Sequence, residues 1–231
     1  MVEKDPAKIA RMFSAIAPSY DLLNRLLSMG VDKRWRKKAI RWLSPREGIY
    51  LDVATGTCDL ALEIARQCAS AKIIGVDFSH EMLVAGQKKI KGGQILLGRG
   101  DALSMPFADA TFEGITCAYG IRNFVDLPKG LREMVRTLKP GGQVSILEFT
   151  TPANPVIKAL YLFYFTRLLP YVGRLVSGHP DAYTYLPASV MNFPDRTTLK
   201  KIFEDAGFAQ VMVTPLTFGI CDLITARKPP P

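Results

Sequence analysis

Cysteine and histidine are scarce in this sequence of 231 residues. Its four cysteines form no CxxC pair, so neither a zinc knuckle nor a disulfide framework is indicated. The two histidines, His80 and His179, are too few for a histidine-rich metal site. We therefore expect no bound metal and a reducing, cytoplasmic compartment.

Long apolar runs are also missing. The opening stretch, MVEKDPAKIARMF, is charged from its third residue and lacks the apolar core of a signal peptide. The most apolar region, residues 156–176, is interrupted by Lys158, Arg167, Pro170 and Arg174. No run therefore reaches the roughly 18 apolar residues that a membrane-spanning helix needs, although this region could still lie against a membrane surface.

Acidic residues are outnumbered, and the net charge is +9. Residues 1–50 carry eleven Lys and Arg against five Asp and Glu, and the densest stretch is DKRWRKKAIRW at 32–42. This stretch is either a solvated helix face or a patch that attracts anionic lipid headgroups at a membrane surface. Nucleic acid is not expected as a partner, because no binding motif with interleaved aromatic residues is present.

From about residue 47, short apolar segments alternate with segments of helical spacing. The alternation predicts strands at 48–54, 71–78, 94–102, within 111–123 and at 143–150, with helices at 59–69, at 79–90 and from 127 to a stop at Pro140-Gly141-Gly142. A helix at 195–208 and strands around 210–216 and 218–228 complete the pattern. This order favours an α/β fold with a mostly parallel, seven-stranded sheet and helices on both faces.

Residues 151–195, which are rich in aromatic residues and proline, break the alternation. We predict one domain with four parts: a helical N-terminal arm (1–46), a βα core that binds the ligand (47–150), an insertion (151–195) and a terminal helix with strands (196–231). The arm and the insertion are expected to cover one cleft, with the insertion over the substrate.

Polar residues gather where the predicted strands end. They are Asp52 to Thr57, Asp77, Asp101, Tyr119 to Asn123, and Glu148. In open parallel sheets the ligand lies beyond the carboxyl ends of the strands. The agreement between these two patterns predicts the ligand site at this edge of the sheet.

The first of these strand ends, in YLDVATGTCDLALEIARQ (50–67), resembles a nucleotide-binding corner but has a single glycine, Gly56, in its turn. A phosphate-binding turn needs more glycines, and the carboxylate of Asp52 would repel phosphate. A cationic ligand without phosphate suits this corner. S-adenosylmethionine fits, since its ammonium and sulfonium would lie near the turn and its carboxylate could take backbone N–H groups. Gly56 would allow close approach, and Thr55 and Thr57 would supply hydroxyls.

The later strand ends support the same donor. Asp77 follows Gly56 by 21 residues, which is the usual spacing for an acid that binds ribose hydroxyls. Asp101, followed by Ala102, could contact the adenine amine. The alternative is that these acids only cap helices.

Two blocks, YDLLNRLLSMGVDKRWRK (20–37) and LREMVRTLKPGGQVSILEFTTP (131–152), closely resemble signatures of the ubiquinone/menaquinone biosynthesis C-methyltransferases. The blocks at 100–123 and 175–190 are similar to the same family, and the resemblance extends over about residues 8–228. It implies a Rossmann-like class I methyltransferase that uses S-adenosylmethionine to methylate a demethylmenaquinol or a related prenylated benzoquinol. The family's pattern places cofactor contacts at Thr57, Asp77, Asp101 and Ala102, and we add Tyr119.

The resemblance also implies site residues for the acceptor. Arg122 and Asn123 match the family's RN pair, and we expect Arg122 to stabilise the developing phenolate. Asn123 would orient the quinol or a water that takes the proton. His179 is an alternative base, and Arg122→Ala should keep donor binding but lose most turnover. Tyr20, Asn24 and Tyr183 are expected against the donor or substrate, and 156–176 along the isoprenoid tail.

Three positions depart from the family's pattern: Cys58 and Asp32 stand where glycine and often histidine are found, and Ala118 stands where some members have serine. The alternatives are methylation of another lipophilic phenol, a non-catalytic scaffold of quinone synthesis, and a nicotinamide-dependent oxidoreductase. The missing phosphate glycines disfavour the oxidoreductase. Two alternatives stay open: the substrate ring is a naphthoquinol or a benzoquinol, and the protein is a monomer or a homodimer.

Overall fold

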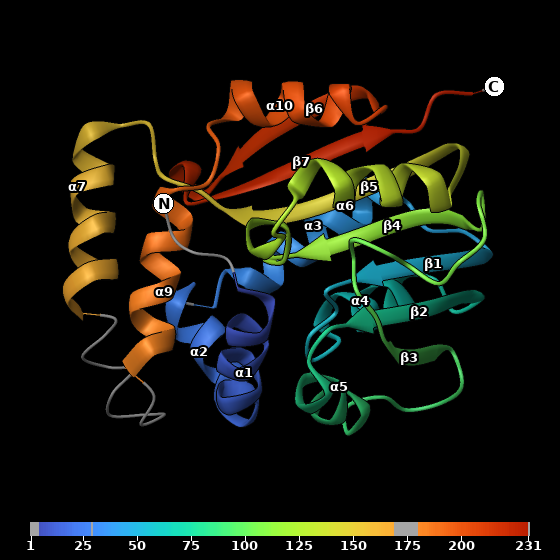
Figure 1. Ribbon diagram of the computed structural model, residues 1–231, viewed down its shortest axis with the longest axis horizontal. Helices are drawn as coiled ribbons and strands as arrows, with labels where there is room; N and C mark the ends of the chain where they lie inside the picture. Colours follow the sequence, from blue (N-terminus) through green and yellow to red (C-terminus); the bar gives the residue numbers. More distant parts are fainter. Residues whose placement is uncertain (1–4, 29, 169–179, 231) are drawn as a thin grey trace.

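The computed structural model describes residues 5–28, 30–168 and 180–230 (Figure 1). One sheet of seven strands runs through it in the order β3-β2-β1-β4-β5-β7-β6. The strands are β1 (Gly48–Val53), β2 (Ala71–Asp77), β3 (Ile95–Arg99), β4 (Phe112–Ala118), β5 (Leu138–Phe149), β6 (Ala209–Leu216) and β7 (Cys221–Arg227). Only β7 pairs antiparallel to its neighbours, so the predicted mostly parallel α/β sheet is confirmed.

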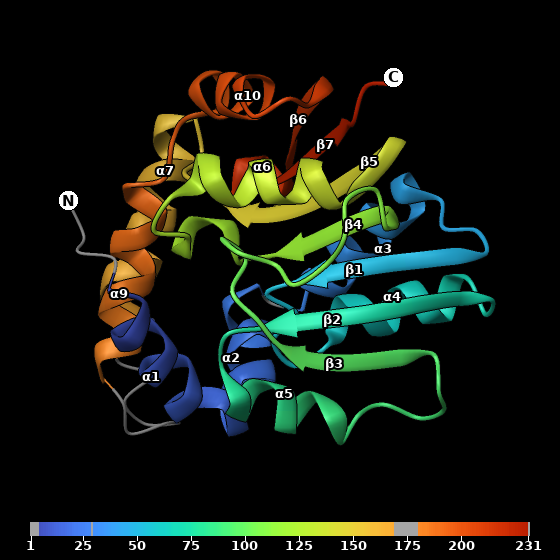
Figure 2. The same cartoon turned by 45° about the vertical axis from the view of Figure 1, so that its right-hand side comes forward.

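Helices cover both faces of the sheet (Figure 2). The helices α3 (Asp32–Leu43) and α4 (Asp59–Gln67) pack on one face, and α6 (Leu127–Thr137) and α10 (Arg196–Asp205) on the other. The remaining long helices are α1 (Pro6–Ile16), α2 (Tyr20–Leu27), α5 (His80–Gln87), α7 (Pro155–Phe163) and α9 (Pro180–Met191). Single turns lie at η1 (Ala17–Ser19), η2 (Ile121–Asn123), η3 (Tyr164–Leu168) and η4 (Thr217–Gly219).

Side-chain caps start several of these helices where the sequence predicts. The Ser79 hydroxyl accepts the Met82 N–H before α5, and Asp195 accepts the N–H groups of Thr197 and Thr198 before α10. Such a cap contributes about 1 kcal/mol to the stability of a helix start. The helix predicted to run from residue 127 to a stop at Pro140 ends earlier, because α6 stops at Thr137. Leu138 then begins β5 by pairing with Phe112, and burial of Leu138 outweighs the local helical pattern.

The N-terminal arm lies over the carboxyl ends of the parallel strands (Figure 2). The α1 helix is held against α5 by a hydrogen bond between the hydroxyls of Ser14 and Ser79 and by donation of the Ser14 hydroxyl to Glu81. On its other side α1 packs against α9 of the insertion, and α7 lies outermost (Figure 1). The arm and the insertion therefore meet near the edge of the sheet where the polar residues gather.

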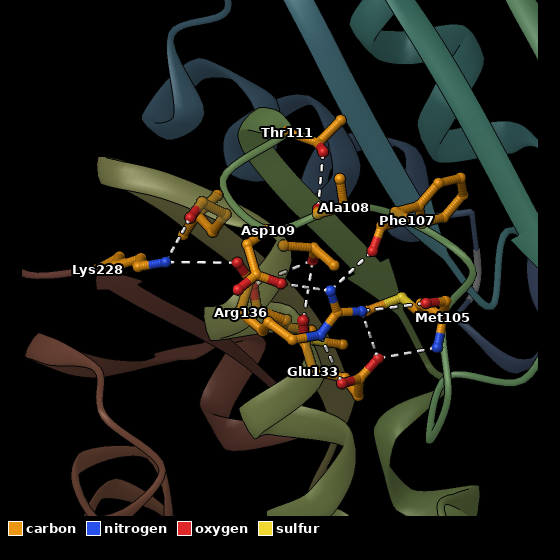
Figure 3. A network of polar contacts seen from close by, with 11 residues as sticks. Met105, Phe107, Ala108, Asp109, Thr111, Glu133, Arg136 and Lys228 are labelled. Carbon is orange, nitrogen blue, oxygen red and sulfur yellow. Dashed lines mark hydrogen bonds and ion pairs between the residues drawn. The ribbon is translucent and has the colours of Figure 1, made fainter.

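The loop between β3 and β4 is fixed by Arg136 of α6 (Figure 3). Its guanidinium donates to the carbonyls of Met105 and Phe107 at 3.0 and 2.7 Å and forms an ion pair with Asp109. Glu133 binds the same guanidinium at two positions and also accepts the Met105 N–H. This loop begins with Asp101 and Ala102, so Arg136 supports one wall of the predicted site from outside.

Replacing Arg136 with alanine should lower the free energy of unfolding by about 2 kcal/mol, because charge-assisted hydrogen bonds to two carbonyls and two carboxylates are lost at once. Urea unfolding measures the change. Arg132→Ala, an exposed arginine of the same helix, is the matched control and should stay within about 0.5 kcal/mol of the wild type. Equal effects of the two substitutions would contradict this role of Arg136.

Candidate active site

The glycine turn after β1 is bound to the end of β2. The Gly56 N–H donates to the Asp77 carboxylate at 2.8 Å, and the Thr55 N–H donates to the Val76 carbonyl at 3.0 Å. The Cys58 N–H is used within the turn. Three backbone donors of the turn thus have partners inside the protein, so our expectation that they bind a ligand carboxylate is wrong for these residues.

Asp52 is buried at the end of β1. Its carboxylate accepts the Thr55 hydroxyl at 2.6 Å and the Thr116 hydroxyl at 2.7 Å. Burial nevertheless raises the pKa of Asp52 to about 6, because the two hydroxyls only partly replace water around the charge. A cation placed beside this carboxylate would favour its ionised form.

Cys58 is in the left-handed region with a φ of 69°. This backbone costs a side chain about 1 kcal/mol. The Cys58 Sγ fills the space opposite Gly86, where any Cβ would collide with it. Burial raises the pKa of the Cys58 thiol to about 12, so the sulfur packs the turn and is no nucleophile.

A main cavity of about 150 Å³ opens beside this turn. It is lined by seven of the predicted residues: Tyr20, Gly56, Asp77, Asp101, Ala102, Tyr119 and Asn123. Asp77 is half-buried, and its partial removal from water raises its pKa; it also accepts the Ser79 N–H at 2.9 Å. The register of the parallel strands brings these residues together, because Val53 lies beside Val76 and Asp77 beside Arg99.

A smaller cavity of about 20 Å³ adjoins the main one, since Tyr20, Gly56 and Tyr119 line both. Asp52 and Thr57, predicted to bind the cofactor, lie here, together with Arg36 of α3. The Thr57 hydroxyl donates to Asp21 of α2, so the arm contacts the glycine turn directly.

Arg122 lies beneath the main cavity and lines neither cavity. Its side chain is 4% exposed and pairs with the fully buried Glu148 at 2.7 Å. The Arg122 N–H donates to the same carboxylate, and the guanidinium also donates to the Tyr119 carbonyl. Asn123 does face the cavity, and its amide oxygen accepts the Tyr185 hydroxyl of α9 at 2.9 Å. Arg122 therefore anchors the segment that presents Asn123.

Several predicted residues have other surroundings. Asn24 is buried in α2 and lines neither cavity, and His179 and the Tyr183 side chain lie outside the described residues. Of the predicted tail path, the described part 156–168 also lines neither cavity, and Tyr161 packs against Phe165 in the core.

Sequence reasoning missed the apolar wall that α1 contributes through Ile9, Ala10 and Phe13. It also missed Arg36, which was counted in the basic stretch at 32–42. The spacing of Asp32 and Arg36, four residues apart on one helix face, was the available signal. That spacing alone does not show that Arg36, rather than another arginine of the stretch, faces inward.

The chain is similar in sequence and in fold to known methyltransferases. The ubiE/COQ5 methyltransferase family matches residues 1–228. A protein of Geobacter sulfurreducens named ubiquinone/menaquinone biosynthesis C-methyltransferase UbiE is 48% identical over 96% of this chain and 88% of its own. A demethylmenaquinone methyltransferase of Bacteroides fragilis is 44% identical over 97% and 94%. Phosphoethanolamine N-methyltransferase 2 of Haemonchus contortus, solved with S-adenosyl-L-methionine, shares the fold (TM-score 0.64, 16% identity, covering 84% of this chain and 52% of its own).

A test of Arg122 by substitution has to take account of its buried partner, Glu148. Arg122→Ala should lower the free energy of unfolding by about 3–5 kcal/mol, because Glu148 is left as an unpaired buried charge. Arg122→Met combined with Glu148→Gln should regain most of that loss in urea unfolding. Lys201→Ala, which breaks an exposed pair with Asp205, is the control and should change stability by less than about 1 kcal/mol.

The stable double variant then tests the role in turnover. We expect it to bind the methyl donor and to lose most turnover, because both the positive charge of Arg122 and its hydrogen bond to the Tyr119 carbonyl are removed. Near-normal turnover would remove Arg122 from the mechanism, and an Arg122→Ala variant as stable as the wild type would contradict the buried pair.

Proposed function

The chain belongs to the ubiE/COQ5 methyltransferase family, and from this we propose that it converts demethylmenaquinol to menaquinol. The reaction class is S-adenosylmethionine-dependent C-methylation in quinone biosynthesis. The name of the Bacteroides relative supports a naphthoquinol ring, whereas that of the Geobacter relative covers both quinones. A prenylated benzoquinol is therefore the second candidate.

One observation carries the proposal: the main cavity joins acids at the strand ends to an apolar wall. Asp77 and Asp101 stand at the ends of β2 and β3, and Ile9, Phe13 and Phe124 are apolar. Acids in this position suit the hydroxyls and amine of an adenosine. An apolar wall suits a flat aromatic ring. A methyltransferase for a lipophilic ring needs these two surfaces side by side.

The residues present fit the donor. A Cβ at Gly56 would lie 3.2 Å from the Met82 Cε, so glycine keeps open the space in which the ribose would lie. Asp77 would bind the ribose hydroxyls, and Asp101 and Ala102 the adenine. Asp52 and Thr57 lie around the smaller cavity, where the methionine part would be held. When bound, S-adenosylmethionine supplies an electrophilic methyl group on its sulfonium.

The protein's part is to position the acceptor and to stabilise its developing charge. A quinol carbon becomes more nucleophilic as its neighbouring hydroxyl, with a pKa of about 10, loses its proton. The Asn123 amide oxygen accepts the Tyr185 hydroxyl, and one amide N–H donates to the Tyr119 carbonyl at 3.5 Å, so the second N–H is the donor left for the ring oxygen. We assign to Asn123 the stabilisation of the phenolate, and to Arg122 the positioning of Asn123. Correct alignment can supply up to roughly 7–11 kcal/mol of the rate enhancement.

Peripheral contact with an anionic membrane surface is part of the proposal, because a prenylated substrate resides in a bilayer. On α7, Val156, Leu160 and Phe163 are 67%, 66% and 58% exposed and share one helix face. On α3, the exposed side chains are mostly Lys and Arg. Among the described residues no helix is long and apolar enough to cross a bilayer.

The activity is tested with donor labelled on its methyl group and with reduced demethylmenaquinol in lipid vesicles. We expect mass spectrometry to find the label on a ring carbon, with faster turnover in anionic than in neutral vesicles. A demethyl benzoquinol as acceptor decides between the two rings. Asp77→Asn is the control and should lose donor binding. Donor binding without methylation of either ring would favour the scaffold alternative.

Asp52 predicts how donor binding depends on pH. Its folded-state pKa of about 6 lies above the ordinary value, so ionisation of Asp52 costs stability as the pH rises from about 4 to about 6. The ammonium of S-adenosylhomocysteine should favour the ionised form. Calorimetry should therefore find this ligand about tenfold weaker at pH 5 than at pH 8. Asp52→Asn should remove that dependence, and a dependence that survives the substitution would exclude Asp52.

A further inference from the structure

Arg36 extends from α3 into the smaller cavity, although it belongs to the most basic stretch of the chain. Its guanidinium is buried, forms an ion pair with Asp32, and lies 3.3 Å from Asp59 of α4. The Tyr119 ring lies against it, with the guanidinium carbon 5.7 Å from the ring centre. These contacts fix the arginine at the cavity and leave part of its hydrogen-bonding capacity unused.

Two polar atoms of this cavity have no partner among the described residues: the Arg36 Nε and the Tyr119 hydroxyl. Both side chains are more than nine-tenths buried, and both line the cavity. Buried polar atoms in native proteins are nearly always hydrogen-bonded. Two such atoms at one cavity therefore indicate a polar group of a ligand, and a guanidinium, which can only donate, requires an acceptor.

A group of the opposite charge also lines this cavity. Asp52 offers a carboxylate, whereas the N–H groups of Thr55, Gly56 and Cys58 in the neighbouring turn already have protein partners. The cavity thus offers a ligand both a cation and an anion. A zwitterionic α-amino acid group has this pattern of charge.

We propose that Arg36 binds the α-carboxylate of the donor's methionine part, while Asp52 binds the α-ammonium. The inference rests on the proposed function, since it concerns the same methyl donor. Tyr119 would add a hydrogen bond from its hydroxyl, and Asp32 and Asp59 hold the guanidinium in place. Arg36 is then a specificity residue that separates the donor and its demethylated product from adenosine derivatives without the amino acid.

Three ligands make the test: S-adenosylmethionine, decarboxylated S-adenosylmethionine and methylthioadenosine, which lacks the amino acid group. Calorimetry on the wild-type chain should find the decarboxylated donor about 10- to 100-fold weaker than the intact one, as expected for a lost charged hydrogen bond. In Arg36→Met this preference should fall below about threefold. Methylthioadenosine should bind both proteins equally, because it does not reach Arg36.

Arg34→Met, at an exposed arginine of the same helix, is the matched control and should keep the full preference. If Arg36→Met does not fold because Asp32 is left unpaired, Asp32→Asn with Arg36→Met removes that charge and carries the same expectation. Equal binding of the two donors by the wild type, or a preference that survives the loss of Arg36, would overturn the inference. Failure of all three ligands to bind the wild type would instead overturn the proposed function.

Discussion

The hydrogen bond from the Gly56 N–H to the Asp77 carboxylate joins the two strand ends around which the site is arranged. The same carboxylate accepts the Ser79 N–H, so the glycine turn, the end of β2 and the start of α5 form one unit. This unit uses up backbone donors that other nucleotide folds direct at phosphate. Recognition here therefore depends on side chains, which explains the acids, hydroxyls and arginine around the two cavities.

Burial of charge shapes the rest of the site. A charge removed from water is tolerated only with a close partner, and each buried group here has a distinct one. Glu148 has Arg122, Asp52 has two threonine hydroxyls, and Arg36 has Asp32. The Arg122–Glu148 pair lines neither cavity and holds a segment in place, whereas Asp52 and Arg36 line the smaller cavity. Structural and ligand-binding roles are thus separated by position relative to the cavities.

The site is completed by parts far apart in the sequence. The N-terminal arm closes the main cavity with apolar side chains and is tied to α5 through Ser14 and Ser79, whose hydroxyl oxygens lie 3.0 Å apart. The insertion reaches Asn123 through Tyr185. Arg136 holds the loop after β3 from behind. Arm and core therefore line the two cavities together, and the insertion holds Asn123 through Tyr185.

The sequence by itself determined the order of strands and helices and the acids at the strand ends, because periodicity, caps and turn residues act locally. Parallel strands then bring Asp77 and Asp101 to one edge. The start of β5 at Leu138 was not predictable, since pairing with Phe112 outweighs the local pattern. Only the tertiary structure decided that Arg36 faces inward and that Arg122 lies beneath the cavity. Which charged side chain is buried depends on partners such as Asp59 and Glu148. No local sequence pattern shows that these partners lie close to Arg36 and Arg122 in space.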